Sequence, residues 1–208
     1  MFNVWSLSSL FIGYLLGSLP VGYLVARAHG VDIFKAGSGN PGATNVKRVL
    51  GARAGHTVFA LDVLKGAVAA GWPMLPFLHA PDTRMMGLVG VIAAVLGHSF
   101  SVFTKFRGGK GVATAAGGLI MLIPVSCGIG AAVWVLTFLV TRYVSLGSIL
   151  AAVVVPTASW LRGNPLPLNI VATAVGLFVI VRHRENIKRL LNGTEARFVK
   201  NTAPGRKQ

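Results

Sequence analysis

The stretch VATAAGGLIMLIPVSCGIGAAVWVLTFLV, residues 112–140, decides how many times this chain folds back on itself. Its 29 residues carry no charge, and as one helix they would extend about 43 Å, whereas the hydrocarbon core of a bilayer is about 30 Å thick. Pro124, Gly128 and Gly130 lie near its middle. The stretch therefore predicts either one tilted helix or two short helices that turn near residues 124–130.

The rest of the chain shares this apolar character. Hydrophobic residues make up 53% of the 208 residues and charged residues only 12%, whereas about 25% of a soluble domain is charged. No Lys or Arg precedes Arg27, so we expect the first apolar segment to be a retained helix rather than a signal peptide. The composition predicts an all-α integral membrane protein with one domain over residues 1–208, and its other apolar segments run at 3–26, 58–78, 85–104, 144–161 and 165–181.

The positions of the basic residues favour two helices in the 112–140 stretch. Membrane proteins keep Lys and Arg on the cytoplasmic side of their spans. If the N-terminus lies outside and the stretch is one helix, 9 cations fall on the cytoplasmic side and 10 on the other. With two helices, near 112–124 and 127–141, 17 are cytoplasmic and only Arg84 and Arg162 are outside. We therefore expect seven spans in a compact bundle, with the N-terminus outside and the C-terminus cytoplasmic.

This topology brings three polar segments to the cytoplasmic face. The first, AGSGNPGATNVKR at 36–48, has glycines and a proline that allow tight turns, and successive backbone N–H groups in such turns bind anions. Its other interpretation is a plain polar loop in which Lys47 and Arg48 only mark the cytoplasmic side. The net charge of +15 follows the loops and the tail, which argues against nucleic-acid binding.

The second polar segment is GHSFSVFTKFRGGKGVAT, Gly97–Thr114. Lys110 lies among glycines just before an apolar helix, where ammonium and helix dipole act together on an anion. The segment lacks the glycine and the Ser or Thr of a Walker A motif, which argues against a nucleotide triphosphatase. His98 is either a polar ligand or a satisfied interface histidine. Phe100, Phe103 and Phe106 either pack at the interface or line a groove for an acyl chain.

The third polar segment is RHRENIKRLLNGTEARF, residues 182–198, in which His183 and Asn186 share one helical face. The alternative is an amphipathic basic tail on anionic lipid.

Inside the second span, Asp62 and Lys65 are three residues apart, and the simplest interpretation is an intrahelical ion pair that faces the bundle. The chain has no Cys/His cluster and no paired carboxylates on this face, so we expect no metal and no cofactor.

Taken together, the three segments resemble the bacterial acyl-phosphate:glycerol-3-phosphate acyltransferases of the inner membrane. The matching residues are GSGNPGATNVKR (Gly37–Arg48), GHSFSVFTKFRGGKGVAT (Gly97–Thr114) and HRENIKRLLNGTE (His183–Glu195), in the order of the family. The resemblance implies a seven-helix bundle whose active site is cytoplasmic. It implies transfer of a fatty acyl group from acyl phosphate to the 1-hydroxyl of glycerol 3-phosphate, which yields lysophosphatidic acid and phosphate in phospholipid biosynthesis. Beyond these substrates and membrane lipids, no obligate protein partner is expected.

The resemblance also implies which residues meet the substrates. The acyl-phosphate group would be held by the first segment, at Ser38, Gly39, Asn40, Thr44 and Asn45. Glycerol 3-phosphate would be held by Arg48, Lys110, Ser148, His183 and Asn186. Arg189 and Glu195 would support the third segment rather than touch substrate.

Two mechanisms and a different class of protein stay open. An acyl phosphate is already activated, so a phosphate oxygen of the donor is expected to take the proton of the attacking hydroxyl, without a covalent enzyme intermediate. The competing mechanism uses His183 as general base. A transporter for a phosphorylated metabolite would share the spans and the anion-binding loops, but transporters place their sites near the bilayer midplane, whereas these segments gather on one face.

Overall fold

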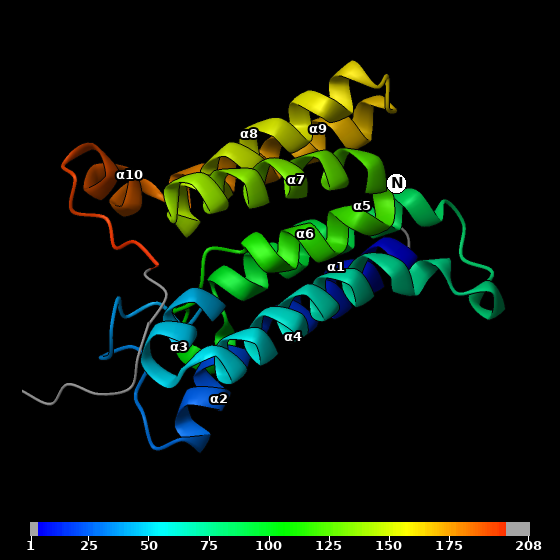
Figure 1. The fold of residues 1–208 in the computed structure, drawn as a ribbon. Coiled ribbons are helices and arrows are strands. Elements are labelled where there is room, and N and C mark those ends of the chain that lie inside the picture. The colour runs from blue at the N-terminus through cyan, green and yellow to red at the C-terminus, as the bar shows by residue number, and fades with distance from the viewer. Residues whose placement is uncertain (1–3, 199–208) are drawn as a thin grey trace, which may run out of the picture.

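The computed structural model describes residues 4–198, and every regular element in that range is helical (Figure 1). The predicted all-helical fold is therefore confirmed. Residues 1–3 and 199–208 of the expected domain, and with them the first residue of the span expected at 3–26, lie outside the described residues. The longer helices are α1 (Val4–Ser18), α4 (Ala52–Gly71), α5 (Thr83–Ser99), α6 (Val112–Leu122), α7 (Pro124–Thr141), α8 (Val144–Leu161) and α9 (Leu166–Arg182).

Shorter elements follow where glycine and proline interrupt the apolar segments. They are α2 (Val21–Ala28), α3 (Ala43–Leu50) and α10 (Arg184–Leu191), with 3-10 turns at Trp72–Met74, Pro76–Leu78 and Val102–Thr104. The segment expected as one helix at 3–26 is broken before α2, because Pro20 has no backbone N–H to continue the ladder. The helix expected at 58–78 begins earlier, at Ala52, and ends at Gly71, after which Pro73 and Pro76 lie in 3-10 turns.

The long apolar stretch forms two helices rather than one. Helix α6 ends at Leu122 and α7 begins at Pro124, a proline at the first helical position that suits its fixed φ. Between them Ile123 adopts φ −136° and ψ 59°, which turns the chain. In Figure 1 the two helices run side by side in opposite directions. The turn lies at Ile123, one residue before the predicted interval 124–130, so the helices expected near 112–124 and 127–141 run over 112–122 and 124–141.

Length and composition identify four candidate membrane spans among the described residues, at Val4–Ala28, Thr83–Thr104, Pro124–Thr141 and Val144–Leu161. A fifth results if α9 and α10, which meet at 57°, count as one broken span. Helix α4 carries Asp62 and Lys65, and α6 has 11 residues, about 16 Å of helix, which is short for a bilayer core. The structure thus supports a helical membrane protein, with four or five spans identified directly.

Helices α4 and α6 approach each other closely through glycine. A Cβ atom placed on Gly66 would lie 2.0 Å from the Thr114 carbonyl oxygen, and one on Gly117 would lie 1.9 Å from that of Val63. Small residues at a helix contact let the backbones meet, which supplies van der Waals packing where lipid offers no hydrophobic driving force. The apolar core beside this contact includes Val91, Leu119, Ala172 and Val175.

The connections divide between two ends of the bundle. In Figure 1, α2, α3, α10 and the turn before α6 gather at the left. The N-terminal end of α1, the 3-10 turns after α4 and the hairpin between α8 and α9 lie at the right. The three polar segments singled out in the sequence therefore share one end of the fold.

The close contact between α4 and α6 predicts how two glycines tolerate alanine. Gly117→Ala places a methyl group against the Val63 carbonyl, so the backbones must separate, at a cost of about 1–3 kcal/mol. The midpoint of thermal unfolding in detergent should fall by several degrees. The matched control is Gly128→Ala, since no atom lies within 4 Å of that Cβ position and alanine favours helix. Equal midpoints for the two variants would contradict this packing.

Candidate active site

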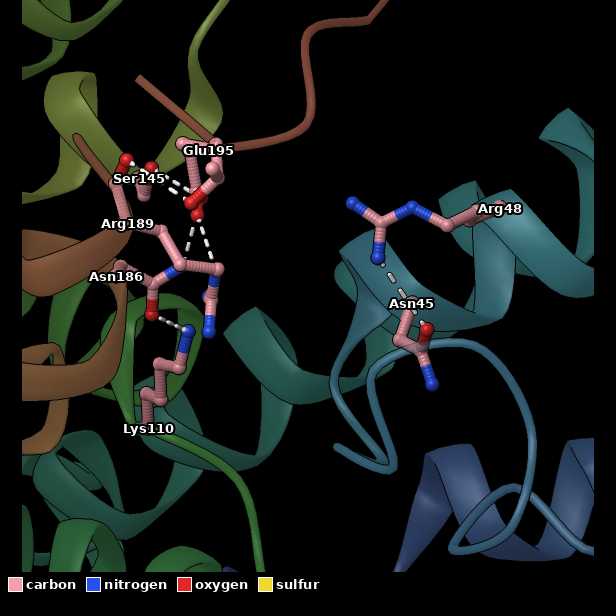
Figure 2. Close-up of polar contacts among 8 residues, drawn as sticks. Asn45, Arg48, Lys110, Ser145, Asn186, Arg189 and Glu195 are labelled. Carbon is pink, nitrogen blue, oxygen red and sulfur yellow. Dashed lines mark hydrogen bonds and ion pairs between the residues drawn. The ribbon is translucent and has the colours of Figure 1, made fainter. Parts of the chain in front are cut away.

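Glu195 gathers the third polar segment around one carboxylate. The side chains of Asn186 and Arg189, both in α10, donate to it through Nδ2 to Oε1 at 2.7 Å and Nε to Oε2 at 2.7 Å. Ser145 at the start of α8 donates to Oε1 at 2.6 Å. These contacts hold the pKa of Glu195 below its ordinary value despite partial burial, which acts in the opposite direction. Glu195 is thus charged, and it joins α8, α10 and the segment after α10 (Figure 2).

Lys110 reaches this cluster from the turn before α6. Gly111, with φ +80°, precedes the helix, and the Lys110 ammonium donates to Asn186 Oδ1. Burial lowers the pKa of Lys110 to about 8. The charge of Glu195 opposes this shift, and the charges of Arg189, Arg182 and Arg48 act with burial. The side chains of Lys110 and Asn186, which the sequence places 76 residues apart, are therefore in direct contact.

Arg182 was not predicted as a site residue, but it fixes the glycine turn. Its Nη2 donates to the Gly109 carbonyl at 2.8 Å and to the Gly108 carbonyl at 3.3 Å. The Gly109 N–H in turn donates to the carbonyl of His98 at 3.1 Å. The Gly109 N–H is therefore bonded within the protein rather than open to a ligand. The group of this turn that contacts Asn186 is the Lys110 ammonium. The sequence signal for Arg182 was only its position beside His183.

His183 ends α9, where it is buried and has a defined tautomer. Its Nδ1 lies 2.8 Å from the Val179 carbonyl, which can only accept, so Nδ1 carries the proton and Nε2 can accept one. Burial lowers the pKa of His183 to about 4, and the charge of Lys110 acts in the same direction. The imidazole is therefore neutral near pH 7.

Ser148 uses its hydroxyl inside the bundle. The Oγ atom donates to the Val144 carbonyl at 2.9 Å and accepts from Trp134 Nε1 at 3.2 Å. The side chain is buried on α8, one helical turn after Ser145. These contacts hold α7 against α8.

In the first polar segment the two asparagines shape the loop. Asn45 Oδ1 accepts from the Ser38 N–H at 2.8 Å, and its Nδ2 donates to the Ala36 carbonyl at 2.9 Å. Asn40 Oδ1 accepts from the Gly42 N–H at 2.9 Å, just before α3 begins. Gly39 adopts φ +68°, in the left-handed region that favours glycine. Ser38 is exposed, while Gly39, Asn40 and Thr44 are half-buried around the N-terminus of α3.

Arg48, in the first polar segment, acts electrostatically on Lys110 of the second. Its Nη1 lies 3.4 Å from Asn45 Oδ1, and Figure 2 shows the guanidinium pointing from α3 toward the side where Lys110 and Glu195 lie. Its charge contributes to the lowered pKa of Lys110. The guanidinium also lies 5.9 Å from the ring of Phe198, which contacts Phe138 on α7. The segment after α10 therefore bridges α7 and α3.

The site carries an excess of positive charge. Among the charges that act on Lys110, three arginines (Arg48, Arg182 and Arg189) are opposed by one carboxylate, that of Glu195. Buried or half-buried cations with too few carboxylate partners favour an anionic ligand. Among residues 4–198, no group of three or more His, Cys, Asp or Glu side chains is arranged to hold a metal ion.

Helices that can span a bilayer and a cationic cluster at one end of the bundle are the features of an integral membrane protein whose polar end favours an anion. A family model described as glycerol-3-phosphate acyltransferase matches residues 7–193. The glycerol-3-phosphate acyltransferase of Rubrobacter xylanophilus is 46% identical over 189 residues, which cover 90% of this chain and 92% of that protein. That of Aquifex aeolicus is 44% identical over 185 residues, covering 89% and 95%. The chain belongs to the glycerol-3-phosphate acyltransferase family, as the three segments predicted.

Two solved structures share the fold. One is PlsY (YgiH), an integral membrane glycerol 3-phosphate acyltransferase, in its glycerol 3-phosphate form, with a TM-score of 0.86 and 42% identity over 93% of this chain and 96% of that one. The other is the lysophosphatidic acid form of PlsY, with a TM-score of 0.83 and the same identity over 93% and 95%. The family and these structures confirm the prediction of an integral membrane acyltransferase fold.

Proposed function

We propose that this protein transfers a fatty acyl group from acyl phosphate to the 1-hydroxyl of glycerol 3-phosphate, and that it releases lysophosphatidic acid and phosphate. The observation that carries the proposal is the excess of cations around Lys110, opposed only in part by Glu195, in a member of this family. The solved relatives hold glycerol 3-phosphate in one form and lysophosphatidic acid in the other, which are the acceptor and the product of this reaction.

The two substrates each bring a phosphate, and we assign them to different segments. Arg48, Lys110, Ser148, His183 and Asn186 would bind glycerol 3-phosphate, with Ser148 acting from the adjoining wall of α8. The loop before α3 and the first turn of that helix would bind the acyl-phosphate group through Ser38, Gly39, Asn40 and Thr44, near the positive end of the helix. Asn45 would contribute by holding the loop in shape, since its amide is bonded to Ser38 and Ala36.

The reaction needs alignment more than it needs an enzyme nucleophile. The glycerol oxygen attacks the acyl carbon, the bond from that carbon to the phosphate oxygen breaks, and the hydroxyl proton passes to the departing phosphate. A general base works best when its pKa is near the working pH, whereas that of His183 is about 4. His183 is better suited to accept a hydrogen bond from the hydroxyl through Nε2 and so orient it.

For the membrane topology we retain the proposal of seven spans with the N-terminus outside. The site would then face the cytoplasm of a bacterial inner membrane, where both water-soluble and lipid substrates arrive. The charge distribution supports this orientation, since Arg84 is in the first turn of α5 and Arg162 directly follows α8, and these helix ends lie opposite the polar segments in Figure 1. The short helix α6 fits a compact bundle that thins the bilayer around it.

The experiment is an assay of the purified protein with palmitoyl phosphate and glycerol 3-phosphate. We expect equal amounts of phosphate and lysophosphatidic acid, no product from palmitoyl-CoA, and full activity in a chelator. Absence of product would overturn the proposal. Uptake of labelled glycerol 3-phosphate into liposomes without acylation would instead identify a transporter.

The lowered pKa of Lys110 predicts how substrate affinity depends on pH. The ammonium is present below about pH 8 and is lost above it, whereas the phosphate of glycerol 3-phosphate, whose second pKa is about 6, is already a dianion. The KM for glycerol 3-phosphate should therefore rise above pH 8, by up to about tenfold per unit. Lys110→Arg, which stays charged, should remove this rise even if its KM is higher throughout. A KM that is flat to pH 9.5 in the wild type would contradict the assignment.

Replacing His183 by Gln distinguishes the two mechanisms. Glutamine keeps a hydrogen-bonding group but cannot serve as a base. If His183 only orients the hydroxyl, the variant should show mainly a higher KM for glycerol 3-phosphate, with kcat reduced by less than about tenfold. A loss of more than about 10³ in kcat at unchanged affinity would identify His183 as the general base.

A further inference from the structure

Four buried polar residues from three helices form a connected chain beneath the Lys110 turn. Asp62 and Lys65 of α4 are paired, with Oδ1 and Nζ 2.8 Å apart, which confirms the predicted intrahelical ion pair. His98 of α5 places Nδ1 at 3.5 Å from the same Asp62 oxygen and at 3.2 Å from Thr114 Oγ1 of α6. Charged groups at this depth are costly to bury and are commonly retained for function. None of the four is assigned to substrate above.

His98 contacts the chain on both sides of Lys110. Its carbonyl accepts from the Gly109 N–H, one residue before Lys110, at 3.1 Å. Its ring packs against Gly109, since a Cβ atom on Gly109 would be 2.1 Å from His98 Nε2. On the other side, Thr114 lies in the first turn of α6, which begins at Val112. The lysine is therefore anchored before and after by one histidine.

On the side of the ring away from the turn, inside the bundle, His98 contacts Asp62, which is paired with Lys65. A carboxylate only accepts, so its approach favours the proton on Nδ1 and sets the ring orientation. Lys65 neutralises Asp62 and also donates to the Leu19 carbonyl at 3.0 Å, in the break between α1 and α2. A small cavity beside these groups reaches both phosphate-binding segments, and its lining includes Pro41, Asp62, Lys65, His98, Gly108 and Gly109.

We propose that His98 is a positioning residue for Lys110. Its carbonyl accepts from the Gly109 N–H and its Nδ1 contacts the Thr114 hydroxyl, and together these two links hold the turn so that the ammonium points toward Asn186 and the phosphate of glycerol 3-phosphate. The inference rests on the proposed function, because it assigns that phosphate to Lys110. Displacement of a substrate-positioning group by about 1 Å can cost on the order of 100-fold in activity, so a residue that touches no substrate can control affinity through this turn.

A purely structural role for the buried chain makes a different prediction. If His98 only fills space and satisfies Asp62, loss of its ring lowers stability and leaves the affinity of folded protein for glycerol 3-phosphate unchanged. If His98 positions the turn, the affinity depends on whether the replacing side chain puts a nitrogen where Nδ1 or where Nε2 of the histidine lies. The amide nitrogen of asparagine occupies nearly the place of Nδ1, whereas that of glutamine occupies nearly the place of Nε2.

The experiment compares His98→Asn with His98→Gln in the purified full-length protein. His98→Asn keeps the contacts with Asp62 and Thr114, so its KM and its calorimetric Kd for glycerol 3-phosphate should stay within about threefold of wild type. His98→Gln loses them, and both constants should rise by about tenfold or more, with kcat within about threefold. Equal constants for the two variants, or a loss confined to kcat, would overturn the inference.

A second pair of variants tests the same link if His98→Gln does not fold. Thr114→Val removes only the hydroxyl that contacts His98, and we expect a rise of about threefold or more in the Kd for glycerol 3-phosphate. Thr157→Val is the matched control, because the Thr157 hydroxyl bonds only within α8, to the Val153 carbonyl at 2.8 Å. An unchanged Kd in Thr114→Val would reject the link.

The calorimetric Kd keeps this inference separate from the proposed function. If the wild type binds glycerol 3-phosphate but does not acylate it, the proposed reaction is wrong and the variant series still tests the role of His98. If the wild type acylates glycerol 3-phosphate and the variants bind it equally well, only the role of His98 is wrong. If the wild type does not bind glycerol 3-phosphate at all, both are wrong.

Discussion

The arrangement of the site depends on the carboxylate of Glu195. Ser145, Asn186 and Arg189 all donate to it, so α8, α10 and the segment after α10 are held at one point. Asn186, held in this way, then accepts from Lys110 and so brings in the turn before α6. Hydrogen bonds to an ionised group are about twice as strong as neutral ones. Without this carboxylate, cations from three different elements would repel one another.

The chain uses its few acids in two different ways. Asp62 is nearly sealed in the bundle, where it is balanced by Lys65 and touches His98. Glu195 lies at the rim, where it compensates only part of the charge of the surrounding arginines and Lys110. The first arrangement pairs a buried charge with an opposite charge, which suits a structural support beneath the turn. The second leaves positive charge unbalanced, which suits a site that a dianion completes.

Several features of the fold were predictable because they are local in sequence. Pro124 and the glycines after it indicated where residues 112–140 could turn, and the distribution of Lys and Arg along the chain favoured two helices, which the structure shows. The three-residue spacing of Asp62 and Lys65 predicted their ion pair, because residues at that spacing share one helical face. The bounds of α8 agree with the predicted 144–161, since charged or polar residues flank both ends of the apolar run. The end of α4 was less predictable, because apolar residues continue past Gly71 into 3-10 turns.

The site was predictable in part, and the rest needed side-chain directions. The family motifs led to Lys110, His183, Asn186 and Arg48, and the structure brings Lys110 into contact with Asn186. Spacing alone did not reveal that Asn45 turns inward to Ser38 and Ala36, that Ser148 bonds to Trp134, or that Arg182 grips the glycine turn. Each of these contacts depends on the rotamer and on the angle at which two elements meet.

The sequence by itself determined that the chain is helical and embedded in a membrane, and which polar segments carry its chemistry, because hydrophobic runs, prolines and charges act over one or two helical turns. Only the tertiary structure decided which of those polar groups come together and which partners they satisfy. The physical reason is that a buried polar atom must find a partner, and the partner comes from whichever helix packs alongside. His98 shows this most clearly, because its neighbours in the sequence say nothing of Asp62, Thr114 and Gly109, which surround it in the fold.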